Sequence, residues 1–295
     1  MSIPATPEPI AQPLAGLRVV CFESRRSAES SRMIARQGGA PIEAPTVREV
    51  PLRGPSGLDG LEADLLRGAP VLLVLLTGVG TELLVEGLCQ SLPREQALSL
   101  LGAESTLIVC RGPKPHASLK PRGIKPALVV GEPNTWRDVL RELDARDWVR
   151  ERVVYVQEYG RTNAELMEAL ALRGAASLSQ IKTYAWTLPD DLAPLEAAIE
   201  RIAAGEADVA LFTSGIQITH LFQIAERLGA RERLQAGLER LVIASVGPLT
   251  TETLASFGLC ADVEPVHPKL GHLMVALGAE APAKLRAKRQ TLYAS

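Results

Sequence analysis

The sequence predicts an α/β protein with two duplicated lobes, each built on a doubly wound parallel sheet. The chain has 295 residues, of which 46% are hydrophobic, and this length allows two domains that each bury a core. Short apolar runs alternate with amphipathic stretches along the chain. Such alternation is typical of parallel sheets covered by helices. The second half of the chain also repeats the first.

The repeat is visible when the second half is laid over the first with an offset of about 135 residues. The pairs that come into register are Arg18-Val19-Val20 with Arg152-Val153-Val154, Gly39-Ala40 with Gly174-Ala175, Thr77 with Thr213, Gly112-Pro113 with Gly247-Pro248, and Gly123 with Gly258. Two copies are too few for a solenoid, so the repeat indicates a duplicated domain.

The first copy begins with a predicted strand at 19–22, where apolar residues stand together. A helix at 28–37 follows and ends at Gly38-Gly39, and a return strand is expected at 40–44. The aliphatic run 71–76 is too short to span a bilayer and suits a buried central strand. A Thr/Gly turn leads from it into a helix. The strand at 106–110 leads into Gly112-Pro113 and another helix.

The second copy repeats this order. Strands are predicted at 153–157, 176–181, 209–212 and 241–246, and the helix at 163–173 begins at Asn163 and stops at Gly174. Asp190-Asp191 follows Pro189 and is interpreted as a helix cap rather than as a pair of catalytic carboxylates.

Composition and motif searches exclude several classes of function. Lys and Arg number 32 and Asp and Glu 34, which gives a net charge of -2; the generic electrostatic case for binding nucleic acid or an anionic membrane is therefore absent. The isolated cysteines and histidines give no metal-site or disulfide pattern. No dinucleotide, P-loop or nucleophile-elbow motif occurs. Residues 1–13 are proline-rich and predict a disordered lead-in rather than a signal peptide.

The loops that follow the strands are the candidate binding site, because loops at the carboxyl ends of parallel strands bind ligands. These loops are 23–26, 77–81, 111–114, 158–163, 213–217 and 247–251, and they combine glycine, hydroxyls and a few cations. Helix-start amides beside such residues suit carboxylates or phosphates, although Gly and Thr also serve as simple turns and caps. Six such loops facing one cleft between lobes favour ligand binding.

Three segments stand out by their order and spacing: Tyr184-x-Trp186 with Pro189, the strand Asp208-Val-Ala-Leu-Phe-Thr-Ser214, and Val246-Gly247-Pro248-Leu-Thr250-Thr251-Glu-Thr-Leu followed by Gly258. Together they resemble the uroporphyrinogen-III synthases. The family's landmarks are a Y…P segment, a strand ending in F-T-S and a G-P-x-T helix start. The resemblance extends over about residues 14–280 and also includes the stretch 17–45.

The resemblance implies two lobes joined by a two-stranded antiparallel hinge. Residues 14–45 and 188–280 would form a discontinuous lobe 1, and residues 50–180 would form lobe 2. Segments 46–51 and 181–188 would be the connecting strands, which suits their β-branched and aromatic content. Residues 281–295 would be a C-terminal tail. Its basic residues Lys284, Arg286, Lys288 and Arg289 form a short basic helix end or tail that is expected to be a solvated surface rather than a binding element.

The activity implied is that of a lyase, uroporphyrinogen-III synthase. This enzyme cyclises hydroxymethylbilane with loss of water and inversion of ring D, in the biosynthesis of tetrapyrroles such as haem, sirohaem and cobalamin. The family uses neither a metal nor an organic cofactor, so none is expected. The protein is expected to be a cytoplasmic monomer. Its only expected partner is the linear tetrapyrrole substrate, and no binding to nucleic acid or membrane is expected. The alternative is a non-catalytic two-lobe ligand sensor or regulatory protein of the same fold.

The expected site residues come from the resemblance and from the loops. Tyr184 matches the family's tyrosine and is the catalytic candidate, assisting departure of the substrate hydroxyl as a hydrogen-bond donor or acid. His220 is expected to pack within its helix. The substrate-binding candidates are Thr77, Gly78, Gly112, Lys114, Arg25, Arg161, Thr213, Ser214, Gly215, Gly247, Pro248, Thr250 and Thr251.

Overall fold

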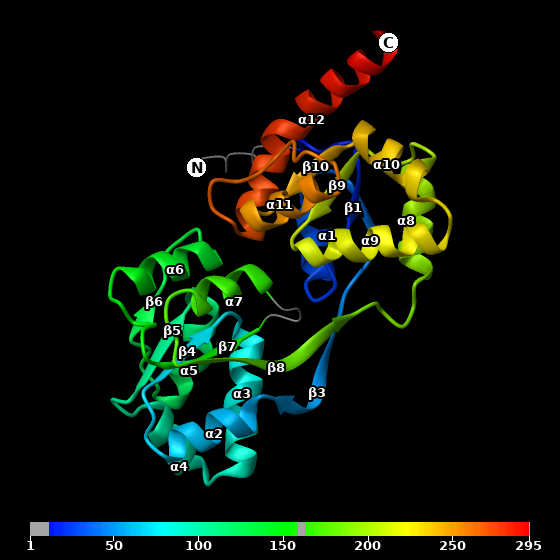
Figure 1. Cartoon of the computed structure of the whole chain (residues 1–295). Coiled ribbons are helices and arrows are strands. Elements are labelled where there is room, and N and C mark those ends of the chain that lie inside the picture. The colour runs from blue at the N-terminus through cyan, green and yellow to red at the C-terminus, as the bar shows by residue number, and fades with distance from the viewer. Residues whose placement is uncertain (1–11, 159–162, 295) are drawn as a thin grey trace, which may run out of the picture. The chain divides into compact units, whose positions relative to one another are not determined.

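The structure, a computed structural model, describes residues 12–158 and 163–294 (Figure 1). The chain divides into two compact units. Unit 1 is drawn from residues up to Arg48 and from Leu188 onward, and unit 2 is Glu49–Thr187. Unit 1 is therefore discontinuous in the sequence, whereas unit 2 is one continuous segment.

Unit 1 is a parallel sheet with helices on both faces. Its elements are β1 (Arg18–Cys21), α1 (Ser27–Arg36), β2 (Ala40–Glu43), α8 (Ala193–Ala203), β9 (Val209–Phe212), α9 (Gly215–Arg227), α10 (Arg231–Arg240), β10 (Val242–Ser245), α11 (Pro248–Ser256) and α12 (Leu270–Ala294). The strand order is β10-β9-β1-β2, and each neighbouring pair is parallel. The blue strand β1 consequently lies among yellow and orange elements from the C-terminal part of the chain (Figure 1).

The core of unit 1 is divided by its sheet, because successive residues of a strand point to opposite faces. Val20 and Phe22 belong to a buried cluster with α8, α9 and α10, and the rings of Phe22 and Phe212 stack with centroids 4.7 Å apart. Val19 and Cys21 belong to the opposite cluster, together with Ile34 of α1 and the apolar residues of α12.

Unit 2 has a larger sheet, which is also covered on both faces. Its elements are β3 (Arg48–Ser56), α2 (Leu58–Leu66), β4 (Val71–Leu75), α3 (Gly78–Ser91), α4 (Arg94–Leu101), β5 (Thr106–Cys110), α5 (Pro113–Leu119), the 3₁₀ helix η1 (Lys120–Arg122), β6 (Leu128–Val129), α6 (Trp136–Asp144), β7 (Val153–Gln157), α7 (Ala164–Ala171) and β8 (Ser177–Thr187). The strand order is β3-β8-β7-β4-β5-β6. Every residue of β4 and β7 is buried, as the continuous apolar runs at 71–76 and 153–157 predict.

The two segments predicted as connecting strands lie mostly in β3 and β8. The strand predicted at 176–181 and the connecting strand predicted at 181–188 form one continuous strand, β8. Its first part pairs in parallel with β7, from Ser177 opposite Val153 to Ile181 opposite Gln157. The segment predicted at 46–51 corresponds to β3, which continues to Ser56 and neighbours β8. The pairing of β8 with β7 extends to Ile181, where the predicted segment 181–188 begins, and β8 then continues to Thr187 as the neighbour of β3.

The residues after 280 do not form a separate tail but continue α12 as far as Ala294. Ala281 and Leu285 are buried in the core of unit 1. Lys288 Nζ donates to the Leu241 carbonyl at 2.7 Å, and Arg289 Nη2 donates to Asp208 Oδ1 at 2.5 Å. Lys288 and Arg289 therefore hold the helix end to unit 1, while Arg286 and Arg289 are exposed as expected of a solvated surface. Charge pattern alone does not reveal that Ala281 and Leu285, four residues apart, share a buried helix face.

Candidate functional site

The predicted binding loops form one group in each unit. In unit 1 they are residues 23–26, 213–217 and 247–251, which follow β1, β9 and β10; we call them the unit 1 loops. In unit 2 they are residues 77–81, 111–114 and 158, which follow β4, β5 and β7; we call them the unit 2 loops. Each group follows three neighbouring parallel strands, so its loops meet at the carboxyl edge of one sheet. Arg161 lies outside the described residues.

Thr77 is the N-cap of α3, and it is hydrogen-bonded both to the helix and to a neighbouring strand. Its Oγ1 accepts the N–H of Gly80 at 3.1 Å, which caps the helix. Gln157, at the end of the neighbouring strand β7, is fully buried. Gln157 Oε1 accepts the backbone N–H of Thr77 at 3.1 Å and the Thr77 hydroxyl at 3.4 Å. A side chain from one strand thus fixes the turn that follows another.

Tyr184 points its hydroxyl at this turn. The residue lies in β8 and is 4% exposed, and its O–H donates to Thr77 Oγ1 at 3.3 Å. Its ring packs edge-on to Trp186 with centroids 6.4 Å apart. Since β8 neighbours β7 and β7 neighbours β4, the sheet brings the predicted catalytic candidate to a predicted substrate-binding residue.

The other predicted residues of the unit 2 loops are of two kinds. Gly78 and Gly112 are close-packed turn residues. The Gly78 carbonyl accepts the Ser118 hydroxyl at 3.1 Å, and a Cβ on Gly112 would lie 2.7 Å from the side-chain amide of Asn134. Lys114, in contrast, is exposed on the first turn of α5. Amides and hydroxyls are built into the turns, whereas the cation lies at the surface.

The turn after β9 is organised by a capping box, in which Ser214 and Gln217 bond one another's backbone. Gln217 Oε1 accepts the N–H of Thr213 at 2.8 Å and of Ser214 at 3.2 Å. The Thr213 hydroxyl accepts Gln217 Nε2 at 2.9 Å and donates to Glu23, which belongs to the loop after β1. Gly215 is required by close packing, because a Cβ there would lie 2.3 Å from Thr253 Oγ1.

The turn after β10 contains Gly247, Pro248, Thr250 and Thr251. Thr250 is 4% exposed, so the structure buries one of the two predicted threonines, whereas Thr251 is half-buried. The Thr251 hydroxyl lies 2.9 Å from the buried Ser245 Oγ and donates to Glu264. Pro248 occupies the first turn of α11, where a missing N–H costs nothing.

Arg25, in the loop after β1, is exposed. Like Lys114, it is therefore a surface cation beside turns that consist mostly of amides and hydroxyls.

Sequence reasoning missed the two glutamines that hold these turns. Gln217 had a usable local signal, because Ser214-x-x-Gln217 matches the capping-box pattern. Gln157 had none, since its partner Thr77 is 80 residues away. Glu23 lies in the predicted loop 23–26 but was not singled out as a site residue, and Ser245 was in neither set; both contact hydroxyls of the predicted loops.

His220 is buried in α9, and its Nδ1 lies 2.7 Å from the Thr46 carbonyl. Because a carbonyl only accepts, the ring nitrogen donates. Burial lowers the pKa of His220, and the hydrogen bond to Thr46 partly opposes this, so the ring is neutral near pH 7. A packing role, as expected from the sequence, agrees with these contacts.

Among residues 12–158 and 163–294, no cluster of three or more His, Cys, Asp or Glu side chains is arranged to hold a metal ion. None of the helices in these segments has the length and apolar character needed to cross a membrane.

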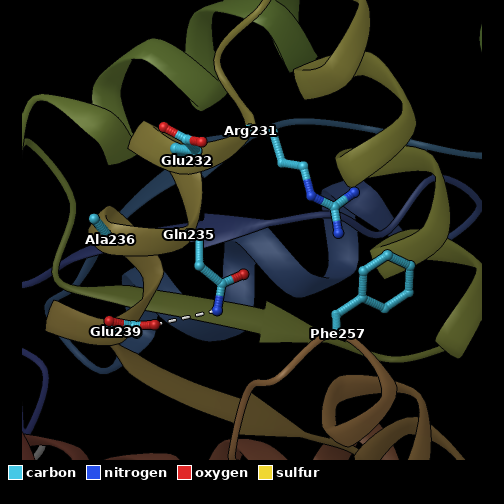
Figure 2. Close-up of a pocket in the computed structure, with 6 residues that line it drawn as sticks. All are labelled: Arg231, Glu232, Gln235, Ala236, Glu239 and Phe257. Carbon is cyan, nitrogen blue, oxygen red and sulfur yellow. Dashed lines mark hydrogen bonds between the residues drawn. The ribbon is translucent and has the colours of Figure 1, made fainter.

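A shallow hollow of about 370 Å³ lies on unit 1 at α10 and the end of α11. Figure 2 shows its lining residues, Arg231, Glu232, Gln235, Ala236, Glu239 and Phe257. Gln235 Nε2 donates to Glu239 Oε1 at 3.2 Å, one turn further along α10. The hollow shares no residue with either group of loops, so it is not part of the candidate site.

Comparison with known proteins gives consistent matches over most of the chain. Residues 28–274 match the family described as uroporphyrinogen-III synthase HemD. A Bacillus subtilis protein named uncharacterized protein YjjA is 30% identical over 272 residues, which is 90% of this chain and 96% of that protein. A Methanothermobacter thermautotrophicus protein, provisionally named a uroporphyrinogen-III synthase, is 28% identical over 255 residues, covering 85% of this chain and 93% of its own.

Among solved structures, a mutant uroporphyrinogen III synthase from Thermus thermophilus superimposes with a TM-score of 0.68 at 23% identity. The match covers 91% of this chain and 100% of that one. At this identity the likeness shows the fold, and it confirms the predicted α/β class with parallel sheets.

Proposed function

The chain belongs to the uroporphyrinogen-III synthase family, and from this premise we propose that it cyclises hydroxymethylbilane with loss of water and inversion of ring D. The observation that carries the proposal is the contact of the Tyr184 hydroxyl with Thr77 at the carboxyl end of β4. It provides a proton donor at the edge of a parallel sheet where ligands of such folds bind.

Tyr184 is proposed to assist the first step, in which the terminal carbon–oxygen bond of the substrate breaks. The departing hydroxyl needs a proton to leave as water, and a positioned phenol supplies a hydrogen bond or that proton. The carbon left behind is attacked by the substituted carbon of ring D. Ring closure through a spirocyclic intermediate then inverts that ring. A proton is finally lost from carbon, so that the whole reaction releases one water.

Positioning is the larger task, because this flexible substrate also closes unaided to the uninverted isomer. Its eight carboxylates need many hydrogen-bond donors. The turns at Thr77, Thr213 and Thr251 place helix-start amides at the carboxyl edges of the sheets, which suit anions. The threonine hydroxyls themselves bond Gln157, Glu23 and Glu264. We therefore propose that the substrate is bound mainly by these amide donors, with Arg25 and Lys114 as supplementary cations and with neither metal nor cofactor.

The remaining predicted loop residues, Gly78, Gly112, Ser214, Gly215, Gly247 and Pro248, are proposed to bind through their backbone. Support comes from their close packing, which brings main-chain groups to the carboxyl edge of each sheet. Thr250 is 4% exposed, like Tyr184, and it remains a candidate.

A duplicated architecture is also part of the proposal. The unit 1 order β10-β9-β1-β2 corresponds to the order β5-β4-β7-β8 inside unit 2. The same elements are paired by the sequence offset of about 135 residues. This agreement supports two copies that have exchanged their first strands. It also supports a hinge at the junctions after Arg48 and Thr187, where the chain passes between units.

The decisive experiment is product analysis with hydroxymethylbilane. The proposal expects the inverted isomer, formed faster than spontaneous closure. Formation of the uninverted isomer alone, at the spontaneous rate, would refute it and favour the alternative, a non-catalytic ligand sensor of the same fold. We further propose a cytoplasmic monomer acting on this small molecule alone, and sedimentation velocity would test the monomer.

A further inference from the structure

The contact between Gln157, Thr77 and Tyr184 has a direction that hydrogen-bond chemistry settles. The Gly80 N–H and the Gln157 Oε1 both lie within hydrogen-bond distance of Thr77 Oγ1, at 3.1 Å and 3.4 Å. An amide N–H only donates and an amide oxygen only accepts. Thr77 therefore gives its single hydroxyl proton to Gln157 and presents its lone pairs to Gly80.

The Tyr184 hydroxyl, 3.3 Å from Thr77 Oγ1, then has one available role toward Thr77. With the Thr77 proton on Gln157, the Tyr184 hydroxyl donates to the remaining lone pair of Thr77. The Gln157 amide cannot simply turn over, because its oxygen also accepts the backbone N–H of Thr77 and its nitrogen donates to the Glu158 carbonyl. Gln157 thus decides, through Thr77, which way the phenolic proton points.

We propose that Gln157 is a positioning residue for Tyr184: by holding the Thr77 hydroxyl proton, it makes Thr77 an acceptor and fixes the direction of the tyrosine O–H. This inference rests on the proposed function only for its catalytic meaning. In the proposed reaction, Tyr184 gives its proton to the departing hydroxyl. The Thr77 hydroxyl then turns its own proton from Gln157 to the tyrosine oxygen and stabilises the negative charge that develops there.

Gly80 provides independent support from packing. A Cβ on Gly80 would lie 1.9 Å from Gln157 Nε2, so the glutamine amide occupies the space that a side chain at this helix position would fill. In unit 1 the corresponding third position of α9 carries Gln217, which holds the Thr213 and Ser214 amides itself. The two units thus hold the same kind of turn with a buried glutamine, but from different elements.

The test measures ionisation of Tyr184 without any turnover. The full-length protein is prepared with 3-fluorotyrosine at its four tyrosines, and each is titrated by ¹⁹F NMR, with Tyr184→Phe identifying the resonance. Gln157→Met keeps the length of the side chain and removes the acceptor, which frees the Thr77 proton to bond the phenolate. We expect Tyr184 to ionise about one pH unit lower, the shift that one ordinary hydrogen bond produces.

Two further variants separate this mechanism from general damage. Gly80→Ala leaves Gln157 chemically intact but displaces its amide, and should shift Tyr184 in the same direction. In a Thr77→Val background, Gln157→Met should cause no further shift, because the effect passes through Thr77. Gln217→Met is the matched control. It removes the side-chain oxygen that accepts the backbone N–H groups of Thr213 and Ser214 in unit 1, and it should leave the Tyr184 titration unchanged.

An unchanged titration in Gln157→Met, an equal shift in Gln217→Met, or a full shift that persists in Thr77→Val would each overturn the inference. Failure of the proposed function is distinguishable from this, because product analysis would then give only the uninverted isomer while the Tyr184 shifts remained as expected.

Discussion

Asp208, at the start of β9, is a buried carboxylate held by two arginines that are far away in the sequence. Its Oδ2 accepts the backbone N–H of Arg18 at 2.8 Å and Arg18 Nε at 3.0 Å, and its Oδ1 accepts Arg289 Nη2. Burial acts to raise the pKa of Asp208, but the hydrogen bonds and charge of Arg18, with the charge of Arg289, outweigh it and lower the pKa. Folding is therefore coupled to ionisation of this group.

The first prediction concerns the pH dependence of stability. Because the folded-state pKa of Asp208 is below its unfolded value of about 3.9, its contribution is complete above roughly pH 5 and is lost as pH falls through the folded pKa. Asp208→Asn should lower the free energy of unfolding by about 1–3 kcal/mol at pH 7, and this difference should shrink toward pH 3. Urea unfolding across that range measures it.

The control is Asp190→Asn, since Asp190 pairs with Arg48 at the surface and such pairs contribute little. A loss of stability in Asp208→Asn that stayed constant down to pH 3 would show that the carboxylate charge is not its source.

The second prediction concerns Tyr184. Tyr184→Phe removes one hydroxyl and leaves the packing against Trp186 intact. If the hydroxyl assists water loss, kcat should fall by roughly 10²–10⁴-fold, while the product should still be the inverted isomer. Lys114→Ala, which removes one exposed cation, should mainly raise KM. Steady-state kinetics with isomer analysis compares the two, and unchanged turnover in Tyr184→Phe would remove this residue from the mechanism.

At the scale of elements, α12 shows how one helix combines apolar and charged contacts. Leu273, Leu277, Ala281 and Leu285 recur at every fourth residue and are buried against the sheet of unit 1. Lys288 and Arg289, beyond them, bond groups beside the starts of β9 and β10. The end of the helix is therefore structural.

The third prediction is that Leu285→Ala destabilises unit 1. Truncating a buried leucine loses its transfer free energy and leaves a cavity, at a cost of about 2–5 kcal/mol. Arg286→Ala, at the exposed neighbouring position, should have almost no effect. Urea unfolding of the whole chain provides the measurement, and equal stability of the two variants would mean that the helix end does not contribute to the core.

At the scale of the whole molecule, the order of strands in unit 1 decides which parts can fold alone. β1 pairs with β2 on one side and with β9 on the other, so an early segment lies inside a sheet completed by late ones. Unit 2 has all six of its strands in one continuous segment.

The fourth prediction follows from this difference. A fragment of residues 49–187 should fold cooperatively by itself, because its sheet and both of its cores are complete. A fragment of residues 188–295 should not, because β9 would lose β1 and the core would lose Val20 and Phe22. Adding residues 1–48 as a separate peptide should restore structure. Circular dichroism and urea unfolding test this, and a cooperative transition in the 188–295 fragment alone would contradict it.

Sequence alone was sufficient for features that depend on nearby residues. The strands β4 and β7 are buried on both faces and therefore appear as continuous apolar runs, and helix starts such as Asn163 carry local capping residues. Gly112-Pro113 and Gly247-Pro248 mark equivalent turns, because in each pair the proline occupies the first turn of the following helix. Tyr184 and Thr77 were each found as candidates, one from the family resemblance and one from a loop.

Contacts between distant segments required the folded chain. Gln157 bonds Thr77 across 80 residues, and Arg18 bonds Asp208 across 190. Such pairs have no fixed spacing, so no local pattern marks them; they exist because parallel strands in register bring one loop or strand end beside another. The contact of Tyr184 with Thr77, the continuation of β8 past Ile181 and the burial of Leu285 all depend on the same packing of remote elements.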